Sequence, residues 1–432
     1  MATLEGKKQN KIFYGWFLLV SVWLLTAVVT GMFVNSFSQF LIPMTEAFGI
    51  SRTEFALANS LISVAVCGGS PFVGQVFEKF NPKNVIRAGI LLVVIGWFGY
   101  SFATGKATLY ACALCIGIGS NFAGAVVTNI VLNNWFHAKK GFAMGFATTG
   151  SGFGSAVFNP LASSIIVASG YQAAIRTLGI IAIVCLLPTF LLFRYAPEDM
   201  GLVPYGDEDP EAAAANAQAA AQKKLEMSQK GGYTRQQAFK TPKFWAICFI
   251  AFFLSTGAIG IFSHISAFLV DSGFEPVKAG ALISTISLSM AAAKIFFGWL
   301  NDKIGTYKNF IVMASIGVVG QIMILNISPK GGMAEITAFI FGIAFACTNL
   351  LSPLITVHGL GSKEYGKIFG VVSLFLYAGP ILAGLFSGAI FDSTGSYDIA
   401  FKIYAGMYVM ALILGIIFLK KPYQDGEEEK HA

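Results

Sequence analysis

One lysine stands inside an apolar run of this 432-residue chain. Lys294 lies between the alanines at 291–293 and the residues Ile295-Phe296-Phe297, whereas the 22 acidic residues lie in tails, loops or at the ends of apolar runs. A charge in the middle of a hydrocarbon layer costs about 2.5–3.5 kcal/mol on insertion scales, and such charges mark functional sites. We therefore predict that Lys294 is the counter-charge of a bound anion. The alternative is a side chain that snorkels to the interface, one helical turn away at Gly298.

Four further polar side chains fall within apolar runs and are candidates to contact the same anion: Asn121, Asn349, Tyr377 and His264. An amide or a phenol can hydrogen-bond a ligand hydroxyl or carbonyl. It can equally form a hydrogen bond between two membrane helices, which contributes about 0.6 kcal/mol of stability on average. His264 titrates near neutral pH. Its alternative role is that of a core histidine whose hydrogen bonds are satisfied.

The composition excludes most classes of protein. Hydrophobic residues make up 55% of the chain, charged residues 12%, and the mean hydropathy is +0.68. Soluble domains carry about 25% charged residues, so this chain has too little polar surface to be one. A soluble enzyme, a disordered scaffold and a disulfide-rich secreted protein are excluded. The net charge is +7, but the basic residues lie between apolar runs. This distribution is typical of membrane topology signals and does not indicate a nucleic-acid surface.

The apolar runs predict an all-α membrane protein with twelve transmembrane helices, because each span needs about 20 apolar residues. Two sets of six runs are separated by a polar stretch: 13–38, 54–77, 84–104, 108–135, 141–168 and 173–194, then 243–270, 277–300, 308–327, 333–357, 366–391 and 397–419. We predict an N-terminal six-helix bundle (1–195), a cytoplasmic linker (196–240) and a C-terminal six-helix bundle (241–432). Within the linker, the Ala/Gln-rich stretch from Glu211 to Lys224 predicts a solvated helix.

The basic residues predict the orientation. Of the 29 Lys and Arg residues, six fall on the side opposite the termini: Arg52, Lys106, Arg176, Lys278, Lys330 and Lys402. Apart from Lys294, the other 22 fall on the side of the termini. Cytoplasmic loops carry the excess of Lys and Arg, so both termini are expected in the cytoplasm. With short tails, we expect the inner membrane of a bacterium.

The two halves repeat each other at an offset of about 225 residues. Residues 74–83, after the second run, and 298–308, after the eighth, both read Gly, three residues, an acid and then basic residues. The shared positions are Gly74, Glu78 and Lys83 in the first copy and Gly298, Asp302 and Lys308 in the second. A duplicated six-helix unit is one architecture of secondary transporters, with the substrate between the halves near the bilayer midplane.

This repeat resembles the cytoplasmic signature loop of the major facilitator superfamily, and the resemblance covers the whole chain. The first copy departs from the family pattern at Glu78 and Asn81, and the second at Thr306. Glu78 and Asp302 are expected at cytoplasmic helix ends, where they can pair with basic groups or a neighbouring helix N-terminus and latch the halves together in the outward-facing state. The alternative is that these loops only determine topology.

Three stretches resemble the monocarboxylate porter family and the similar oxalate/formate exchangers: Tyr14-Gly15-Trp16, residues 135–145, and residues 239–245. The resemblance implies an Arg for the substrate carboxylate at or near Lys294. Lys is a departure, because it cannot make a bidentate fork. Met290 stands where many animal members have an acid. The glycines that follow residue 144 are expected to allow close helix packing and sliding of the fifth span against the eighth: Gly145, Gly150, Gly152 and Gly154.

We therefore expect a secondary transporter of small organic monocarboxylates such as lactate, pyruvate or formate, working by alternating access. Its coupling is H⁺ symport or anion exchange, and in symport Lys294 or His264 must carry the proton because no buried carboxylate is available. The alternatives are a carrier of a dicarboxylate or an amphipathic drug, and a non-transporting membrane sensor. No catalytic or metal-binding constellation and no nucleotide-binding loop occur, so we expect no enzyme activity, cofactor, metal or nucleic acid. We expect a monomer in the lipid bilayer.

Overall fold

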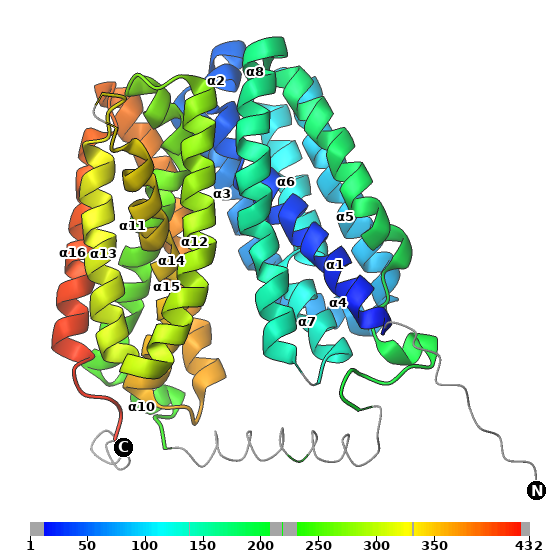
Figure 1. Cartoon of the computed structure of the whole chain (residues 1–432), viewed down its shortest axis with the longest axis vertical. Helices are drawn as coiled ribbons and strands as arrows, with labels where there is room; N and C mark the ends of the chain where they lie inside the picture. The colour runs from blue at the N-terminus through cyan, green and yellow to red at the C-terminus, as the bar shows by residue number, and fades with distance from the viewer. Residues whose placement is uncertain (1–12, 138, 208–217, 219–230, 331, 425–432) are drawn as a thin grey trace, which may run out of the picture.

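The computed structural model describes residues 13–137, 139–207, 218, 231–330 and 332–424. Its described residues fold into helices and connecting turns. Figure 1 shows the helices in two groups, with the helices of residues 14–192 on one side and those of residues 242–418 on the other. The Ala/Gln-rich part of the linker lies outside the described residues. The flanking linker segments contain the turn η5 (Pro197–Met200) and the short helix α10 (Arg235–Phe239).

The first group contains six predicted spans. In chain order its helices are α1 (Tyr14–Thr26), continued by the π-helical η1 (Ala27–Val34), η2 (Phe37–Phe40) and α2 (Leu41–Phe48), then α3 (Arg52–Gly69) with α4 (Val73–Lys79), α5 (Pro82–Gly99), α6 (Lys106–Ala123) with α7 (Ala125–Trp135), and α8 (Lys140–Leu192). The α3–α4 pair is bent by 58°. Helix α8 holds two predicted spans, joined at Gly170, whose φ of 82° interrupts the helical backbone.

The second group contains the other six spans. Its helices are α11 (Pro242–Asp271), α12 (Pro276–Ile304), α13 (Thr306–Leu325), α14 (Ala334–Leu360), α15 (Tyr365–Thr394) and α16 (Asp398–Phe418). Within the described residues, nine stretches are long and apolar enough to cross a membrane, and the two bent pairs raise this to eleven. Since α8 is interrupted at Gly170, the observed helices agree with the twelve predicted spans.

Local sequence signals start and stop these helices. At α3, Ser51 Oγ accepts a hydrogen bond from the Glu54 amide (3.2 Å), and Glu54 Oε2 accepts one from the Ser51 amide (3.0 Å). This capping box satisfies two amides that a helix start leaves unpaired. Helices α5, α11 and α12 begin with prolines, which favour the first helical position because their missing N–H is not needed there. Glycines with positive φ end α2, α12 and α15: Gly49, Gly305 and Gly395.

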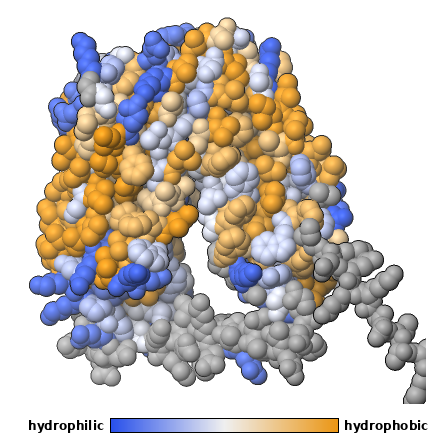
Figure 2. Space-filling view, viewed as in Figure 1, coloured by the Kyte–Doolittle hydropathy of each residue, from blue (hydrophilic) through white to orange (hydrophobic). Residues whose placement is uncertain are grey.

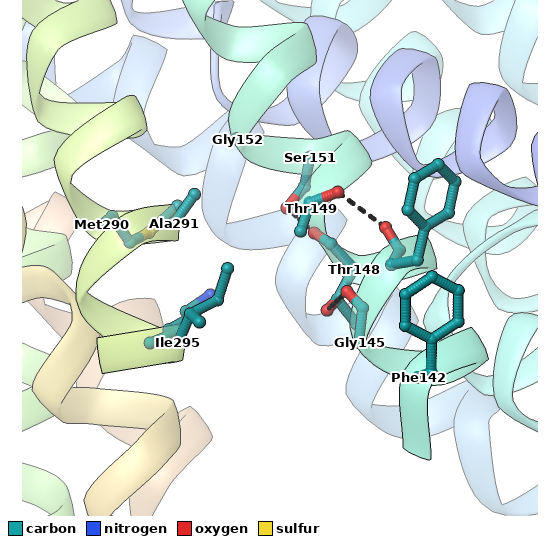
Figure 3. A pocket seen from close by; sticks show the side chains of 11 residues that line it. Phe142, Gly145, Thr148, Thr149, Ser151, Gly152, Met290, Ala291 and Ile295 are labelled. Atoms are coloured by element: carbon teal, nitrogen blue, oxygen red, sulfur yellow. Dashed lines mark hydrogen bonds between the residues drawn. The ribbon is translucent and has the colours of Figure 1, made fainter. Parts of the chain in front are cut away.

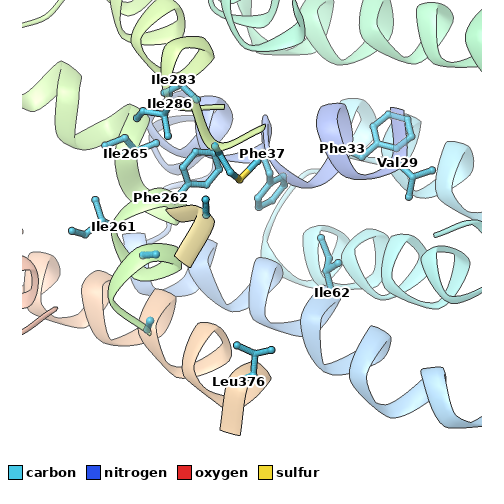
Figure 4. Packing of buried hydrophobic residues seen from close by; sticks show 14 of the residues in the cluster. Val29, Phe33, Phe37, Ile62, Ile261, Phe262, Ile265, Ile283, Ile286 and Leu376 are labelled. Carbon is cyan, nitrogen blue, oxygen red and sulfur yellow. The ribbon is translucent and has the colours of Figure 1, made fainter. Parts of the chain in front are cut away.

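The two groups touch mainly along two helix pairs, α8 with α12 and α3 with α15, and α11 also contacts η2 and α2. Ser284 Oγ of α12 donates to the Ala156 carbonyl of α8 (2.7 Å), and Ser60 Oγ of α3 donates to the Ile381 carbonyl of α15 (2.9 Å). Apolar side chains from both groups pack in the same region, as Figure 4 shows with Phe37 and Ile62 of the first group and Phe262 and Leu376 of the second. These contacts hold the groups together over one part of their length.

The groups are closed at one end and open at the other. Figure 2 shows continuous surface where the groups meet at the top and a deep hollow between them below. We call the top the closed end; it contains Arg52, Asp271 and Asp392. The open end contains the turns from Lys79 to Pro82 and from Ile304 to Thr306, and the described chain begins and finishes on this side (Figure 1).

Candidate functional site

A cavity of about 630 Å³ lies between the two groups, below the closed end. Its lining comes from both groups and is largely apolar, with hydroxyl and amide groups between. The polar or titratable side chains on it are Thr30, Asn35, Ser38, Asn59, Ser63, Cys67, Ser70, Ser120, Asn121, Ser151, Ser263, His264, Lys294, Ser373 and Tyr377. Lys294 is the one charged residue on this described lining, and no acidic residue lines it. The cavity therefore carries one positive charge when that lysine is protonated.

Lys294 lies on α12 at the junction of two hollows. It lines the central cavity and also a crevice of about 510 Å³ between α8 and α12. Within the described part of the chain, its ammonium forms no ion pair and no hydrogen bond. A half-buried ammonium without a protein partner is suited to pair with a soluble anion, because it otherwise bears its desolvation cost uncompensated.

Tyr377 and Asn59 face the same cavity from opposite groups. Tyr377, on α15, is 53% exposed, and its hydroxyl has no hydrogen-bond partner in the described structure. Asn59, on α3, also leaves its amide without a bond to any described residue. Both can donate a hydrogen bond to a carboxylate or hydroxyl in the cavity. Asn59 is not among the site residues predicted from the sequence, although an amide within an apolar run is a visible signal.

Asn121 lies on the cavity wall but is already bonded. Its Nδ2 donates to the Ala65 carbonyl of α3 (2.9 Å) and to the Gly117 carbonyl (3.2 Å), while its Oδ1 accepts from Ser70 Oγ (3.2 Å). The side chain is only 3% exposed. The structure thus favours the alternative role of joining α6 to α3.

The other predicted amide, Asn349, cannot be placed by its side chain, which lies outside what the structure describes. Its backbone falls between the two segments of α14, Ala334–Thr348 and Leu350–Leu360, which are bent by 43° relative to one another. Its role in binding stays a prediction.

His264 borders the cavity as a fully buried residue with both ring nitrogens bonded. Nε2 lies 2.9 Å from the Gly384 carbonyl, and Nδ1 lies 3.1 Å from the Tyr397 hydroxyl. A carbonyl only accepts, so Nε2 carries the proton and Nδ1 accepts from Tyr397. Arg52 Nη1 donates to that same hydroxyl (2.8 Å). Both ring nitrogens of His264 are therefore bonded within the closed end, and its role as a proton carrier stays a prediction.

Arg52 holds the closed end together. From the sequence, this residue was expected only as one of the basic residues that determine the orientation. Its guanidinium makes two hydrogen bonds to Asp271 of the second group (2.6 and 3.2 Å) and lies 3.5 Å above the Phe391 ring. The backbone amides of Arg52 and Thr53 both donate to the Asp392 carboxylate (3.0 Å each). Asp392 therefore caps the positive N-terminus of α3 from the other group. Burial also raises the pKa of the Tyr397 phenol, which keeps this hydrogen-bond donor protonated at neutral pH.

The four glycines of α8 that were predicted to allow helix packing face different neighbours. A Cβ at Gly150 would lie 2.4 Å from the Trp23 carbonyl of α1, and one at Gly154 would lie 2.2 Å from the Ala27 carbonyl of η1. These two glycines therefore allow α8 to pack against α1 and η1. Gly152 faces α12, and Gly145 faces open space. The expected packing role is confirmed for three of them, although two of the three face the first span and not the eighth.

The signature loops lie at the open end. Gly74 and Glu78 are on α4, and Gly298 and Asp302 are on α12. Lys83 and Lys308 lie in the first turns of α5 and α13. Neither Glu78 nor Asp302 forms an ion pair with any described residue. The latch between the halves is not engaged in this state, and its role stays a prediction.

Two six-span groups of helices around a shared cavity are an architecture of secondary transporters. Residues 23–375 match the sequence profile of the Major Facilitator Superfamily, so the chain belongs to that family. It is also similar in fold to a D-xylose-proton symporter (TM-score 0.73, 12% identity, covering 95% of this chain and 99% of the symporter). A bacterial homologue of the human lysosomal transporter Spinster, in an inward-facing conformation, gives a TM-score of 0.68 at 15% identity over 96% of this chain and all of that one.

Curated relatives confirm the resemblance to monocarboxylate and oxalate/formate carriers. The oxalate:formate antiporter of Oxalobacter formigenes is 24% identical over 89% of this chain and 86% of its own length. Monocarboxylate transporter 13 of Bos taurus is 25% identical over 92% of this chain and 87% of its own. Among the described residues, no group of three His, Cys, Asp or Glu side chains is placed to hold a metal ion.

Proposed function

We propose that this transporter carries small organic monocarboxylate anions, with Lys294 as the counter-charge of the carboxylate. The observation that carries the proposal is the charge of the cavity: one ammonium, no acid and no ion pair for that ammonium among the described residues. With Lys294 protonated, one bound monoanion makes the cavity neutral. A bound dianion would leave a net negative charge in a largely apolar environment. The names of the curated relatives include monocarboxylates and formate, which agree with this charge balance, and also oxalate, a dianion that does not.

Tyr377 and Asn59 complete the proposed site. A carboxylate offers about four acceptor positions, and an ammonium provides a point charge without fixed geometry. A phenol on α15 and an amide on α3 supply directed donors from the two groups. Because the donors belong to different groups, a bound anion joins the groups and its release lets them separate.

The proposed orientation puts both termini in the cytoplasm of a bacterium, following the excess of basic residues at the open end. The structure then corresponds to an inward-open state, with residues 1–195 and 241–432 as the two rocking units. Reorientation of a loaded, neutral cavity is easier than that of an empty, charged one, which produces exchange if Lys294 stays protonated. If Lys294 releases its proton when empty, the same residue produces H⁺ symport.

The test is uptake of radiolabelled lactate, pyruvate, formate and oxalate into proteoliposomes. Wild type is compared with Lys294→Ala and Lys294→Arg, and Lys402→Ala serves as a control at an exposed lysine that lines neither hollow and lies outside the signature loops. Each protein is assayed with a pH gradient and, separately, with internal anion and no gradient.

We expect monocarboxylate uptake in wild type and Lys402→Ala, at least a tenfold loss in Lys294→Ala, and partial retention in Lys294→Arg. Gradient-driven uptake identifies symport, and uptake that requires internal anion identifies exchange. Normal transport by Lys294→Ala, or transport of oxalate alone, contradicts the proposal.

A further inference from the structure

The crevice beside the proposed carboxylate site has the shape of a wedge. At Gly152 the helices α8 and α12 nearly touch, because a Cβ there would lie 3.1 Å from Ala291 Cβ and 3.2 Å from the Ser287 carbonyl. Two helical turns toward the open end, a Cβ at Gly145 would meet nothing within 4 Å. Figure 3 shows Ala291 and Ile295 pointing from α12 across this widening gap toward α8.

The crevice offers a ligand almost no free polar group. Its lining is Phe142, Gly145, Phe146, Thr148, Thr149, Ser151, Gly152, Met290, Ala291, Lys294 and Ile295. All three hydroxyls donate to carbonyls of their own helix at 2.7–3.0 Å, as Figure 3 shows for Thr149. All three hydroxyl protons are therefore engaged in hydrogen bonds. The Lys294 ammonium is the single side-chain donor without a hydrogen bond on the described lining of the crevice. An occupant should be apolar along its length and anionic at the Lys294 end.

The side of the crevice opens outward between the two groups. Phe142, Phe146 and Ile295 are 60%, 38% and 67% exposed. Figure 2 shows apolar surface reaching the rim of the hollow on both sides. In a membrane this rim is in reach of acyl chains. The α8 wall from Gly152 to Phe142 runs about 15 Å at 1.5 Å per residue, which matches an extended medium-chain acid.

Resting on the function proposed above, we propose that the crevice holds the aliphatic tail of a medium-chain monocarboxylate, such as octanoate, whose carboxylate pairs with Lys294. The acid enters through the side of the crevice that opens between the two groups, and its aliphatic tail lies along α8 and α12. Shorter acids occupy only the central cavity. Burial of each added methylene strengthens binding about fourfold until the crevice is filled.

The experiment measures equilibrium binding of radiolabelled butanoate, hexanoate and octanoate to the full-length protein in lipid nanodiscs, after subtraction of binding to protein-free nanodiscs. Gly145→Leu adds a side chain on the crevice wall at a position where a Cβ meets nothing within 4 Å. Gly370→Leu is the matched control, since a Cβ there also meets nothing within 4 Å and Gly370 lines neither hollow. Lys294→Ala removes the counter-charge.

We expect wild type and Gly370→Leu to bind octanoate at least tenfold more tightly than butanoate. In Gly145→Leu, octanoate binding falls to the level of butanoate, while butanoate binding is unchanged and shows that the variant is folded. Lys294→Ala loses all three acids.

Equal affinity for all chain lengths in wild type overturns this inference alone, and so does an equal loss in Gly145→Leu and Gly370→Leu. Octanoate binding that persists in Lys294→Ala also overturns it, because the crevice then takes an acyl chain without its carboxylate. Butanoate binding that is independent of Lys294, or absent, contradicts the proposed function itself.

Discussion

The two ends of the molecule use charge in opposite ways. At the closed end, Arg52 of the first group is bonded to Asp271 and Tyr397 of the second, and Asp392 caps α3 from across the interface. At the open end, the ion pairs and caps among the described residues stay within one group. Glu364, for example, accepts from Lys367 (2.6 Å) and from the Arg235 amide (2.8 Å), all within residues 231–424, and these bonds lower the pKa of Glu364.

This difference shows where the conformational equilibrium is set. A charged hydrogen bond contributes about 1.5–3 kcal/mol, whereas an exposed ion pair contributes about 0–1 kcal/mol. Several of the stronger kind cross the interface at the closed end. Opening that end requires breaking them, and the compensation must come from contacts made at the other end.

The largest expected effect comes from Arg52→Ala, which removes the Asp271 pair, the bond to Tyr397 and the contact with Phe391. We expect a shift of about 10- to 100-fold toward opening of the closed end. The measurement is the distance distribution between spin labels on cysteines that replace Glu46 and Asn326, in a background without the native cysteines. Lys106→Ala is the control, because its pair with Glu54 (2.9 Å) lies within one group. A similar shift in both variants would contradict the assignment of the gate to Arg52.

A smaller effect is expected from Gly388→Ala. A Cβ at this position of α15 would lie 2.7 Å from the Thr53 Cα, so the closed end must separate slightly to admit it. Such overpacking costs about 1–3 kcal/mol, and we expect the same label pair to report partial opening. Gly384→Ala, one turn away with its nearest neighbour at 3.8 Å, should leave the distances unchanged. Unchanged distances in Gly388→Ala would show that this contact does not limit opening.

The smallest effect is expected at the open end. Glu78 and Asp302 have no ion-pair partner among the described residues, so Glu78→Gln with Asp302→Asn should not alter the state seen here. If they latch the opposite state, that state loses about 1 kcal/mol or less for each exposed pair. Labels across the open end should then report a further shift toward opening of that end. A shift toward closure would contradict the latch.

The sequence predicts the spans well because burial in a bilayer imposes long apolar runs, and each predicted run lies within or beside an observed helix. It also singles out Lys294, since an isolated charge in such a run is unmistakable. It does not separate Asn121 from Asn59: both are amides in apolar spans, and only the packing of α6 on α3 shows that the first is bonded and the second free. The gate at Arg52 joins residues 219 to 345 positions apart, which a single sequence does not bring together.

If a monoanion pairs with Lys294 as proposed, the lone lysine on the described cavity lining also determines which step of the cycle the membrane voltage acts on. A monoanion on Lys294 leaves the loaded cavity neutral, so the membrane voltage has no charge to act on while the substrate crosses. An empty carrier that keeps its proton moves one positive charge on the return, and each 100 mV then changes the energy of that step by up to about 2.3 kcal/mol. The voltage therefore acts on the unloaded carrier alone, and it sets how often the carrier returns without cargo.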